Sequence, residues 1–235
     1  MTLLSTSGLS KNFAGLQAVQ EVDFDLPAGE IHALIGPNGA GKTTFVGMLC
    51  GRVAASAGSV RFDGQDISAL PAHRRIGLGM AYTFQITSVF GRLSLHENVA
   101  LAARRLHGEV SATVKDALSR VGLYQRAEVP AGDLSYGHQR LLEIAMGLVQ
   151  SPKLLILDEP TQGLSDNEIE TFKDLIRDLA AETTILLIEH NMKVVMETAD
   201  RITVLNFGEV LAEGSPKDIR ANNAVQAAYL GKSDA

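Results

Sequence analysis

Apolar and polar positions alternate along the chain with two periods, and together these predict an α/β fold. Residues 154–157 and 185–188 are apolar without interruption, a pattern typical of parallel strands that are covered on both faces. A third strand is expected at 31–35, where the chain runs directly into a glycine-rich turn. The pattern after that turn predicts a helix at 43–49.

Outside this core the pattern changes twice. Turn residues around 29–30 and 59–64 separate short strands, which predicts an antiparallel layer at the edge. From Ser94 to Val149 the periodicity is helical, so we expect a helical subdomain at 86–149. The chain is therefore predicted to be one domain, 1–235, with an α/β core formed by 1–85 and 150–235. Two short helices are expected in the tail from 216 onward.

Composition narrows the class of protein. Hydrophobic residues make up 46% of the 235 residues and charged residues 20%, as in ordinary globular proteins. The net charge of −6 disfavours nucleic acid as a partner, because neutralising its phosphates requires a basic face. The apolar runs are also far shorter than the ~20 residues that a membrane-spanning helix needs. A membrane role would therefore require partner subunits.

The glycine-rich turn fits the phosphate-loop pattern G-x-x-x-x-G-K-[ST], and it lies between a strand and a helix as that pattern requires. Glycine lets the backbone wrap closely around a phosphate, and the N–H groups at a helix start point toward it. Lys42 provides a point charge for the β- and γ-phosphates, and the Thr43 hydroxyl suits Mg²⁺. The residues expected to bind the nucleotide here are Gly36, Asn38, Gly39, Gly41, Lys42, Thr43 and Thr44.

Two acids follow the apolar run at 154–157. Ligands bind at the carboxyl ends of strands in such sheets. We therefore expect Asp158 to hold Mg²⁺ and Glu159 to accept the proton of an attacking water. With the phosphate loop, these acids indicate a P-loop NTPase, which at this point could be a kinase, a GTPase or a helicase.

A further segment, from Leu134 to Arg140, precedes an apolar helical run. Ser135 is a good N-cap, and the positive end of the helix behind it could bind a γ-phosphate. Taken alone, the segment fits a well-capped helix equally well.

These segments stand in one order along the chain: the phosphate loop, Gln85 after the strand-like 80–84, Leu-Ser-Tyr-Gly-His, Leu-Leu-Ile-Leu-Asp-Glu, Gly-Leu-Ser-Asp and His190. In that order they resemble the nucleotide-binding domain of ATP-binding-cassette (ABC) proteins over nearly the whole chain. The resemblance implies a RecA-like P-loop core with an antiparallel β edge layer and an inserted helical subdomain. It also implies an ATPase that couples hydrolysis of ATP to movement in partner subunits.

The resemblance assigns roles residue by residue. Phe13 matches the aromatic that stacks on adenine. Gln85 matches the residue that contacts Mg²⁺ and the lytic water, and His190 matches the switch histidine that contacts the γ-phosphate.

Ser135 and Gly137 match the signature motif, and Asp166 matches the acid of the D-loop. The chain departs from the family at two places. The signature commonly reads Leu-Ser-Gly-Gly-Gln, whereas this chain has Tyr136 and His138, and its D-loop reads Gly-Leu-Ser-Asp where Gly-Leu-Asp or Ala-Leu-Asp is frequent. Activity is expected because the serine and the second glycine remain.

The resemblance further implies partners. A second ABC ATPase subunit, identical or paralogous, would form a head-to-tail dimer in which each ATP lies between Lys42 of one subunit and Ser135 of the other. Transmembrane permease subunits and, indirectly, a solute-binding protein are the other implied partners. The implied location is peripheral, on the cytoplasmic face of the bacterial inner membrane.

The segments at 83–85, 185–192 and 228–231 are similar to those of branched-chain amino-acid importer ATPases. A closely similar group of ATPases serves urea or short amides. Two alternatives come from other classes: a soluble cassette protein that remodels a ribosome or a DNA-repair complex, and a nucleotide-binding regulator without turnover. The single cassette without long heptads disfavours the first, and the presence of Glu159 and His190 disfavours the second.

Overall fold

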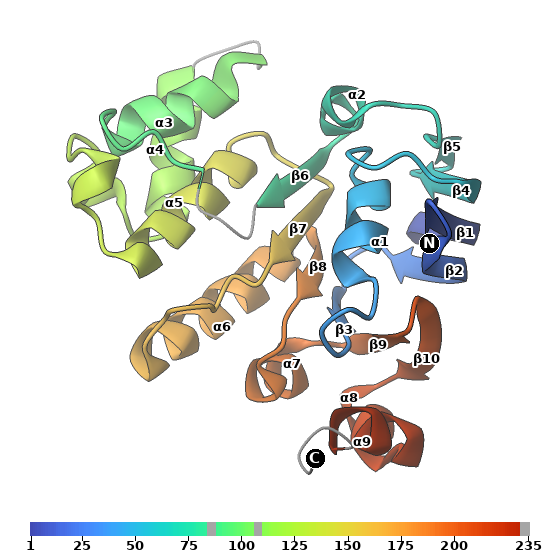
Figure 1. Ribbon diagram of the computed structural model, residues 1–235. Helices are drawn as coiled ribbons and strands as arrows, with labels where there is room; N and C mark the ends of the chain where they lie inside the picture. Colours follow the sequence, from blue (N-terminus) through green and yellow to red (C-terminus); the bar gives the residue numbers. More distant parts are fainter. Residues whose placement is uncertain (84–87, 106–109, 231–235) are drawn as a thin grey trace. The chain divides into compact units, whose positions relative to one another are not determined.

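The computed structural model describes residues 1–83, 88–105 and 110–230, and the chain folds into two compact units (Figure 1). The first unit joins the amino-terminal part, Met1–Leu78, to the carboxyl-terminal part, Thr184–Ala235. The second unit is Gly79–Thr183.

The antiparallel layer predicted from turn residues is confirmed in the first unit. It contains four strands in the order β2-β1-β4-β5: β1 (Thr2–Phe13), β2 (Leu16–Pro27), β4 (Ala57–Phe62) and β5 (Gln65–Asp66). A two-residue turn joins β1 to β2, and both of its residues, Ala14 and Gly15, have positive φ. Such turns match the twist of the strands that they connect.

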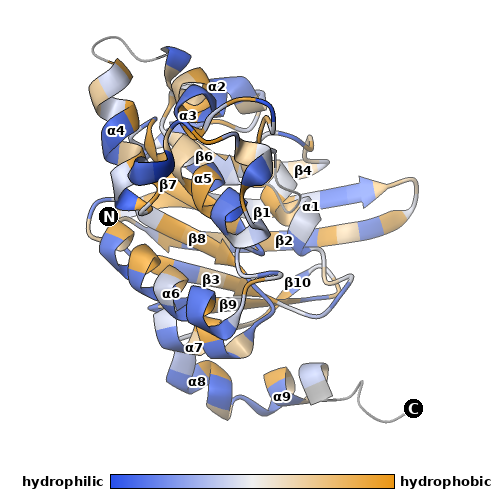
Figure 2. Cartoon of the chain, turned by 90° about the vertical axis from the view of Figure 1, so that its left-hand side faces the viewer, coloured by the Kyte–Doolittle hydropathy of each residue, from blue (hydrophilic) through white to orange (hydrophobic). Residues whose placement is uncertain are grey.

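The first unit also carries strands of a parallel sheet. They are β3 (Ile31–Ile35), β8 (Thr184–Ile188), β9 (Arg201–Asn206) and β10 (Glu209–Gly214). β3 pairs in parallel with β8 on one side and with β9 on the other, and β10 pairs antiparallel to β9. Every residue of β3 and β8 is buried, and hydrophobic colour predominates along both strands in Figure 2. The uninterrupted apolar runs thus predicted strands covered on both faces correctly.

In the described part of this unit the helices are α1 (Lys42–Leu49), α2 (Ala72–Gly77), α7 (Met192–Thr198), α8 (Pro216–Ala221) and α9 (Asn223–Leu230). The last two are the short helices that the tail predicted. They pack with α7, β3 and β9 around one cluster of buried apolar side chains: Ala33, Ile35, Val195, Ala199, Ile202, Val204, Ile219 and Val225. Burial of a Val or Ile side chain stabilises a fold by about 1.5–3 kcal/mol, so this cluster is what fixes the tail to β3.

The second unit contains two parallel strands, β6 (Met80–Thr83) and β7 (Leu154–Asp158). Its helices are α3 (Leu95–Ala102), α4 (Val110–Arg120), α5 (Tyr136–Leu148) and α6 (Asp166–Ala180). Three single turns, at Ala103–Arg105, Tyr124–Arg126 and Ala131–Asp133, connect the helices. α3, α4 and α5 contact one another, in the stretch where the sequence predicted helices.

Helices α3 and α6 of the second unit begin at side-chain caps. Ser94 and Ser165 form capping boxes at the starts of α3 and α6, because each accepts a backbone N–H while a glutamate three residues later accepts the serine N–H. α6 carries hydrophobic and hydrophilic residues on different faces (Figure 2). Among the helices that the structure describes, none combines the length and apolar character that crossing a membrane demands.

Candidate functional site

The predicted phosphate loop leaves the end of β3 in a conformation that only glycine can adopt. Gly36 has a φ of +155°, and a Cβ added there would lie 2.2 Å from the carbonyl oxygen of Leu205. Gly41 has a φ of +98°, and its Cβ would lie 2.4 Å from the carbonyl oxygen of Ala18. The sequence therefore places glycine where the backbone of another strand approaches too closely for any side chain.

The loop ends at a helix start that carries no side-chain cap. Gly41 occupies the N-cap of α1, makes no side-chain hydrogen bond, and is followed by a first turn without acidic residues. The first N–H groups of a helix have no partner within it, and they carry the positive end of the helix dipole. This end of α1 therefore suits an anionic ligand.

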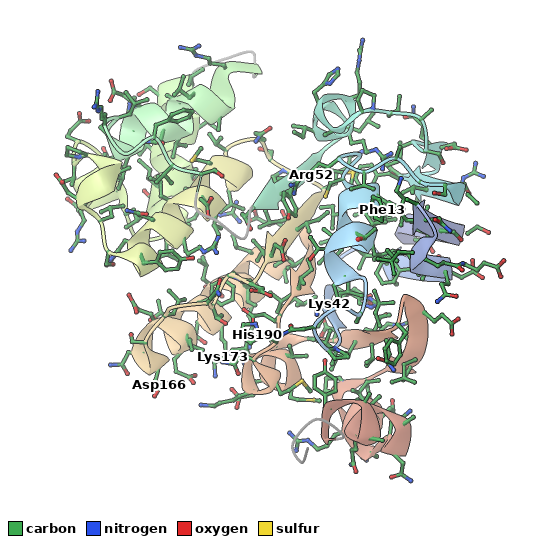
Figure 3. All side chains as sticks on the ribbon, in the orientation of Figure 1. Phe13, Lys42, Arg52, Asp166, Lys173 and His190 are labelled. Carbon is green, nitrogen blue, oxygen red and sulfur yellow. The ribbon has the colours of Figure 1, made fainter. Side chains whose placement is uncertain are left out.

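Lys42 and Thr43 begin α1. The Lys42 ammonium donates to the loop carbonyls of Gly36, at 2.7 Å, and Pro37, at 3.2 Å. Thr43 and Asn38 are exposed. The first unit thus brings the residues predicted to bind the phosphates together in a single turn, with the cation folded back onto it (Figure 3).

His190 follows β8, the strand that pairs in parallel with β3. Leu34 and Ile188 are register partners, so the phosphate loop and His190 leave the same edge of the sheet. The buried carboxylate of Glu189 accepts the backbone N–H groups of His190 and Asn191 at 3.1 and 3.2 Å. That carboxylate fixes the turn and leaves the His190 ring exposed.

Phe13 ends β1, and its ring is 46% exposed. The ammonium of Lys11 lies 4.9 Å from the ring centroid, a cation–π contact. An exposed aromatic face of this kind can stack on a flat ligand.

In the second unit, the predicted acids stand at the carboxyl end of β7. Asp158 is buried, and its carboxylate accepts a hydrogen bond of 2.6 Å from the Tyr82 hydroxyl. Glu159 has a φ of +48°, a left-handed conformation that costs energy for a residue with a side chain. Such strain is found at functional sites more than elsewhere. Gln85, which is predicted to follow β6, lies outside the described residues.

The Leu-Ser-Tyr-Gly-His segment forms the start of α5. Ser135 is the N-cap, and its hydroxyl accepts the His138 N–H and contacts the His138 ring nitrogen Nδ1 at 2.7 Å. A Cβ at Gly137 would lie 2.5 Å from a carboxylate oxygen of Glu168, so the Glu168 side chain would have to shift to admit it. Tyr136 lies against Gly163, and its hydroxyl accepts a hydrogen bond from Arg140.

Asp166 is the first residue of α6, and its side chain is exposed. The cap of that helix is Ser165, so the Asp166 carboxylate is not used to close the helix end. Ser165, which the frequent Gly-Leu-Asp form of the D-loop lacks, is therefore the N-cap of α6.

Sequence reasoning missed three residues that organise these positions. Tyr82 bonds to Asp158, Glu189 holds the turn before α7, and Arg75 donates two hydrogen bonds of 2.7 Å to the carbonyls at the end of α1. No local signal distinguishes them, since each acts on a partner far along the chain or on its own turn. Glu189 directly precedes His190 in the sequence, but nothing there predicts that its carboxylate is buried and accepts the His190 N–H.

Two family models match the chain. The model described as ABC transporter matches residues 19–162, more than half of the chain. The model described as branched-chain amino acid ATP-binding cassette transporter matches residues 209–235.

Curated relatives are similar over almost the full length. LivG of Escherichia coli strain K12, a high-affinity branched-chain amino acid transport ATP-binding protein, is 40% identical, with 98% of each chain covered. BraF of Pseudomonas aeruginosa, which carries the same description, is 39% identical, with the same coverage.

Solved structures are similar as well. The ADP conformation of an ATP-binding cassette of an ABC transporter superposes with a TM-score of 0.91 at 26% identity, covering 99% of this chain and all of that one. The structure of cbiO1 from Clostridium perfringens, part of the ABC transporter complex cbiONQ, gives a TM-score of 0.86 at 26% identity, covering 99% and 96%.

Proposed function

Because this chain belongs to the ATP-binding-cassette family of ABC transporter ATPases, we propose that it is the ATP-hydrolysing subunit of an importer for branched-chain amino acids. The observation that carries the ATPase assignment is the phosphate loop. Gly36 and Gly41 admit no side chain, and the loop delivers Lys42 to an uncapped helix start. The amino-acid substrate rests on the full-length relatives, since no residue of a cassette need touch the solute.

The nucleotide roles follow the geometry of each unit. Gly36, Asn38, Gly39, Gly41 and Thr44 would surround the phosphates with backbone and side-chain donors. Lys42 would exchange its loop carbonyls for the β- and γ-phosphates, and the exposed ring of Phe13 would stack on adenine.

Magnesium fits the oxygen donors that the chain offers. A hydroxyl at Thr43 and a carboxylate at Asp158 are ligands that Mg²⁺ prefers, and it commonly takes few protein ligands together with phosphate oxygens. Gln85 is the third proposed ligand, by resemblance. When bound, the ion would offset the charge that develops on the transferred phosphate.

In the reaction, Glu159 would accept the proton of the attacking water, and His190 would contact the γ-phosphate. The buried Asp158 carboxylate accepts a hydrogen bond from the Tyr82 hydroxyl, so it is oriented before any ligand binds. Ser135, Gly137 and Asp166 are proposed to act on the ATP of a second cassette subunit, in a head-to-tail dimer.

The proposed assembly contains transmembrane permease subunits, a second cassette and, indirectly, a solute-binding protein. It would place this chain at the cytoplasmic face of a bacterial inner membrane. We also propose the division of a single domain, 1–235, into an α/β core at 1–85 and 150–235 and a helical subdomain at 86–149. The alternative solutes, urea or short amides, would use the same ATPase chemistry.

The test is uptake of labelled leucine and of labelled urea by cells that lack the gene, complemented with the wild-type chain or with Glu159→Gln. We expect the wild type to restore leucine uptake alone. Purified Glu159→Gln should bind ATP but hydrolyse it at least about a hundredfold more slowly, the scale of a lost general base.

Restored urea uptake would favour the amide importer. An unchanged uptake of both solutes, with ATPase activity retained, would support a cassette outside transport. Full turnover by Glu159→Gln would remove this residue from the role of general base.

A further inference from the structure

The last described turn of the tail carries a tyrosine that reaches the phosphate loop within the first unit. Tyr229 lies on α9, and its ring packs against the buried cluster that contains Ile35 and Val204. Ile35 is the last residue of β3 and directly precedes Gly36. The ring of Tyr229 therefore packs on the same apolar cluster as the strand from which the phosphate loop departs.

The hydroxyl of Tyr229 is shielded from solvent and faces the backbone N–H of Gly36. Burial raises the pKa of Tyr229 to about 12, and the Gly36 N–H opposes part of that rise. Among the described residues, however, no group completes a hydrogen bond of full geometry with this oxygen. A buried hydroxyl without a completed hydrogen bond costs stability, and a phenylalanine would avoid that cost.

Three groups lie around Gly36: the Leu205 carbonyl, the Lys42 ammonium and the Tyr229 hydroxyl. The carbonyl oxygen of Leu205 leaves no space for a side chain, the Gly36 carbonyl accepts Lys42 at 2.7 Å, and the Gly36 N–H points toward Tyr229. When Lys42 leaves that carbonyl for a phosphate, Gly36 loses this hydrogen bond, and the Leu205 carbonyl and the Tyr229 hydroxyl remain beside it.

We propose that Tyr229 is a positioning residue for the phosphate loop: its hydroxyl accepts the Gly36 N–H fully once nucleotide is bound, and thereby holds the loop in its ATP-binding form. This inference rests on the proposed ATP site. It gives the carboxyl-terminal helix a direct part in nucleotide affinity, and it explains why a polar group is retained against an apolar cluster.

The variant that isolates the hydroxyl is Tyr229→Phe, which keeps the ring and its packing. We expect the Kd for ATP, measured in EDTA so that no hydrolysis occurs, to rise about threefold to tenfold, which is what one neutral hydrogen bond contributes. With Mg²⁺ present, KM for ATP should rise by the same factor while kcat stays unchanged.

A second readout does not depend on activity. The chain has no tryptophan and four tyrosines, so tyrosine fluorescence reports on these side chains alone. Addition of ATP should change that fluorescence in the wild type, and the change should be smaller in Tyr229→Phe. Tyr124→Phe is the matched control, because Tyr124 lies in the second unit beside Lys115, and it should leave both Kd and the fluorescence change intact.

Val225→Ala separates positioning from packing. Val225 belongs to the same cluster as Ile35 but carries no polar atom, so its truncation loosens α9 without removing the hydroxyl. A greater loss of ATP affinity in Tyr229→Phe than in Val225→Ala, at a smaller loss of Tm, supports the proposal. Wild-type affinity in Tyr229→Phe, or equal losses of affinity in both variants, overturns it.

These outcomes are distinct from failure of the ATP site itself. If the wild-type chain binds no ATP, the proposed function fails. If the wild type binds ATP and Lys42→Ala does not, while Tyr229→Phe binds as the wild type does, the ATP site stands and only the role of Tyr229 is lost.

Discussion

The helices α1 and α5 both begin at positions assigned to phosphate, yet their starts are built in opposite ways. α1 begins at a glycine in the left-handed conformation, without a side-chain cap. α5 begins at Ser135, whose hydroxyl already accepts a backbone N–H of its own helix. The start of α1 leaves its N–H groups for a ligand, whereas at the start of α5 the Ser135 hydroxyl already accepts one N–H group.

The two helices also differ in the side chains that they bury along their length. α1 is anchored by buried Phe45, Val46, Met48 and Leu49, and Arg75 satisfies the carbonyls at its far end. α5 carries a buried ion pair, Arg140–Glu143, at 3.0 Å. α5 also buries Leu142, Ile144 and Leu148, so the bodies of the two helices differ in the buried charge of α5 rather than in apolar anchoring.

The largest effect should come from Gly41→Ala, which puts a side chain into the open start of α1. The Cβ would overlap the Ala18 carbonyl, and the left-handed φ is strained, so we expect the free energy of unfolding to fall by more than about 2 kcal/mol. ATP binding should be lost. Urea unfolding and nucleotide titration measure the two effects.

Gly39→Ala is the matched control for stability, because its φ is also positive but no atom lies within 4 Å of the added Cβ. It should cost only the strain, about 1–2 kcal/mol. Equal losses in the two variants would mean that the close approach of Ala18 is unimportant.

Next in size is Lys42→Ala, which removes the cation from the same start. Hydrogen bonds to charged groups contribute about 1.5–3 kcal/mol, so the Kd for ATP should rise about ten- to a hundredfold. The unfolding free energy without nucleotide should change less than ATP affinity, since the Lys42 ammonium lies on the phosphate loop, where it bonds to Gly36 and Pro37. Unchanged ATP affinity, measured by equilibrium dialysis, would contradict the phosphate-loop assignment.

A smaller effect is expected from Ser135→Ala, which opens the capped start of α5. Loss of an N-cap costs about 1 kcal/mol of unfolding free energy. ATP affinity of the single chain should be unchanged, but ATP-dependent dimerisation, followed by light scattering, should weaken.

Ser94→Ala removes a comparable cap from α3 and serves as the control. It should cost similar stability and leave dimerisation intact. If both variants impair dimerisation equally, Ser135 acts only as a cap.

The smallest effect concerns the ion pair inside α5. Burial raises the pKa of the Glu143 carboxyl, against the opposing influences of the Ser88 N–H and Arg140. The folded state then holds its proton in a range where the unfolded state, with the ordinary value of 4.5, has released it. This contribution to stability is therefore full below the ordinary pKa and is lost as pH rises through the folded pKa.

Glu143→Gln should lack that pH dependence, since an amide does not titrate. The difference in unfolding free energy between wild type and variant, measured by urea unfolding across this pH range, should decrease as pH rises and then level off. A difference that grows with pH would show that the pair with Arg140 outweighs the burial.

The parts of the fold that followed from sequence were those with one dominant local signal. Uninterrupted apolar runs predicted β7 and β8, and glycine spacing predicted the phosphate loop that follows β3. The length of β1 and β2 could not be predicted, because bulges interrupt their pairing and shift the alternation of side chains. The part of Tyr82 escaped for a different reason: its partner lies 76 residues away, and nothing local marks such a contact.

The same distinction between local signals and distant contacts applies to the site residues. The positions of Asp158, Lys42 and His190 relative to their own strands could be predicted, since Asp158 ends one buried strand and the other two lie in segments that follow such strands. The burial of Glu189 and the reach of Tyr229 to Gly36 depend on how distant segments pack. Pattern reasoning has no access to such contacts.

The attachment of Lys42 to its own loop has a consequence for selectivity among anions. Any ion entering the loop must replace two hydrogen bonds that the ammonium already makes. Chloride or a single phosphate carries too little charge to replace both hydrogen bonds well. Adjoining phosphates present several oxygens and more negative charge to the ammonium at once. The bonds that Lys42 makes within the loop thus favour polyphosphates: small ions should bind weakly, and a nucleotide should displace both hydrogen bonds.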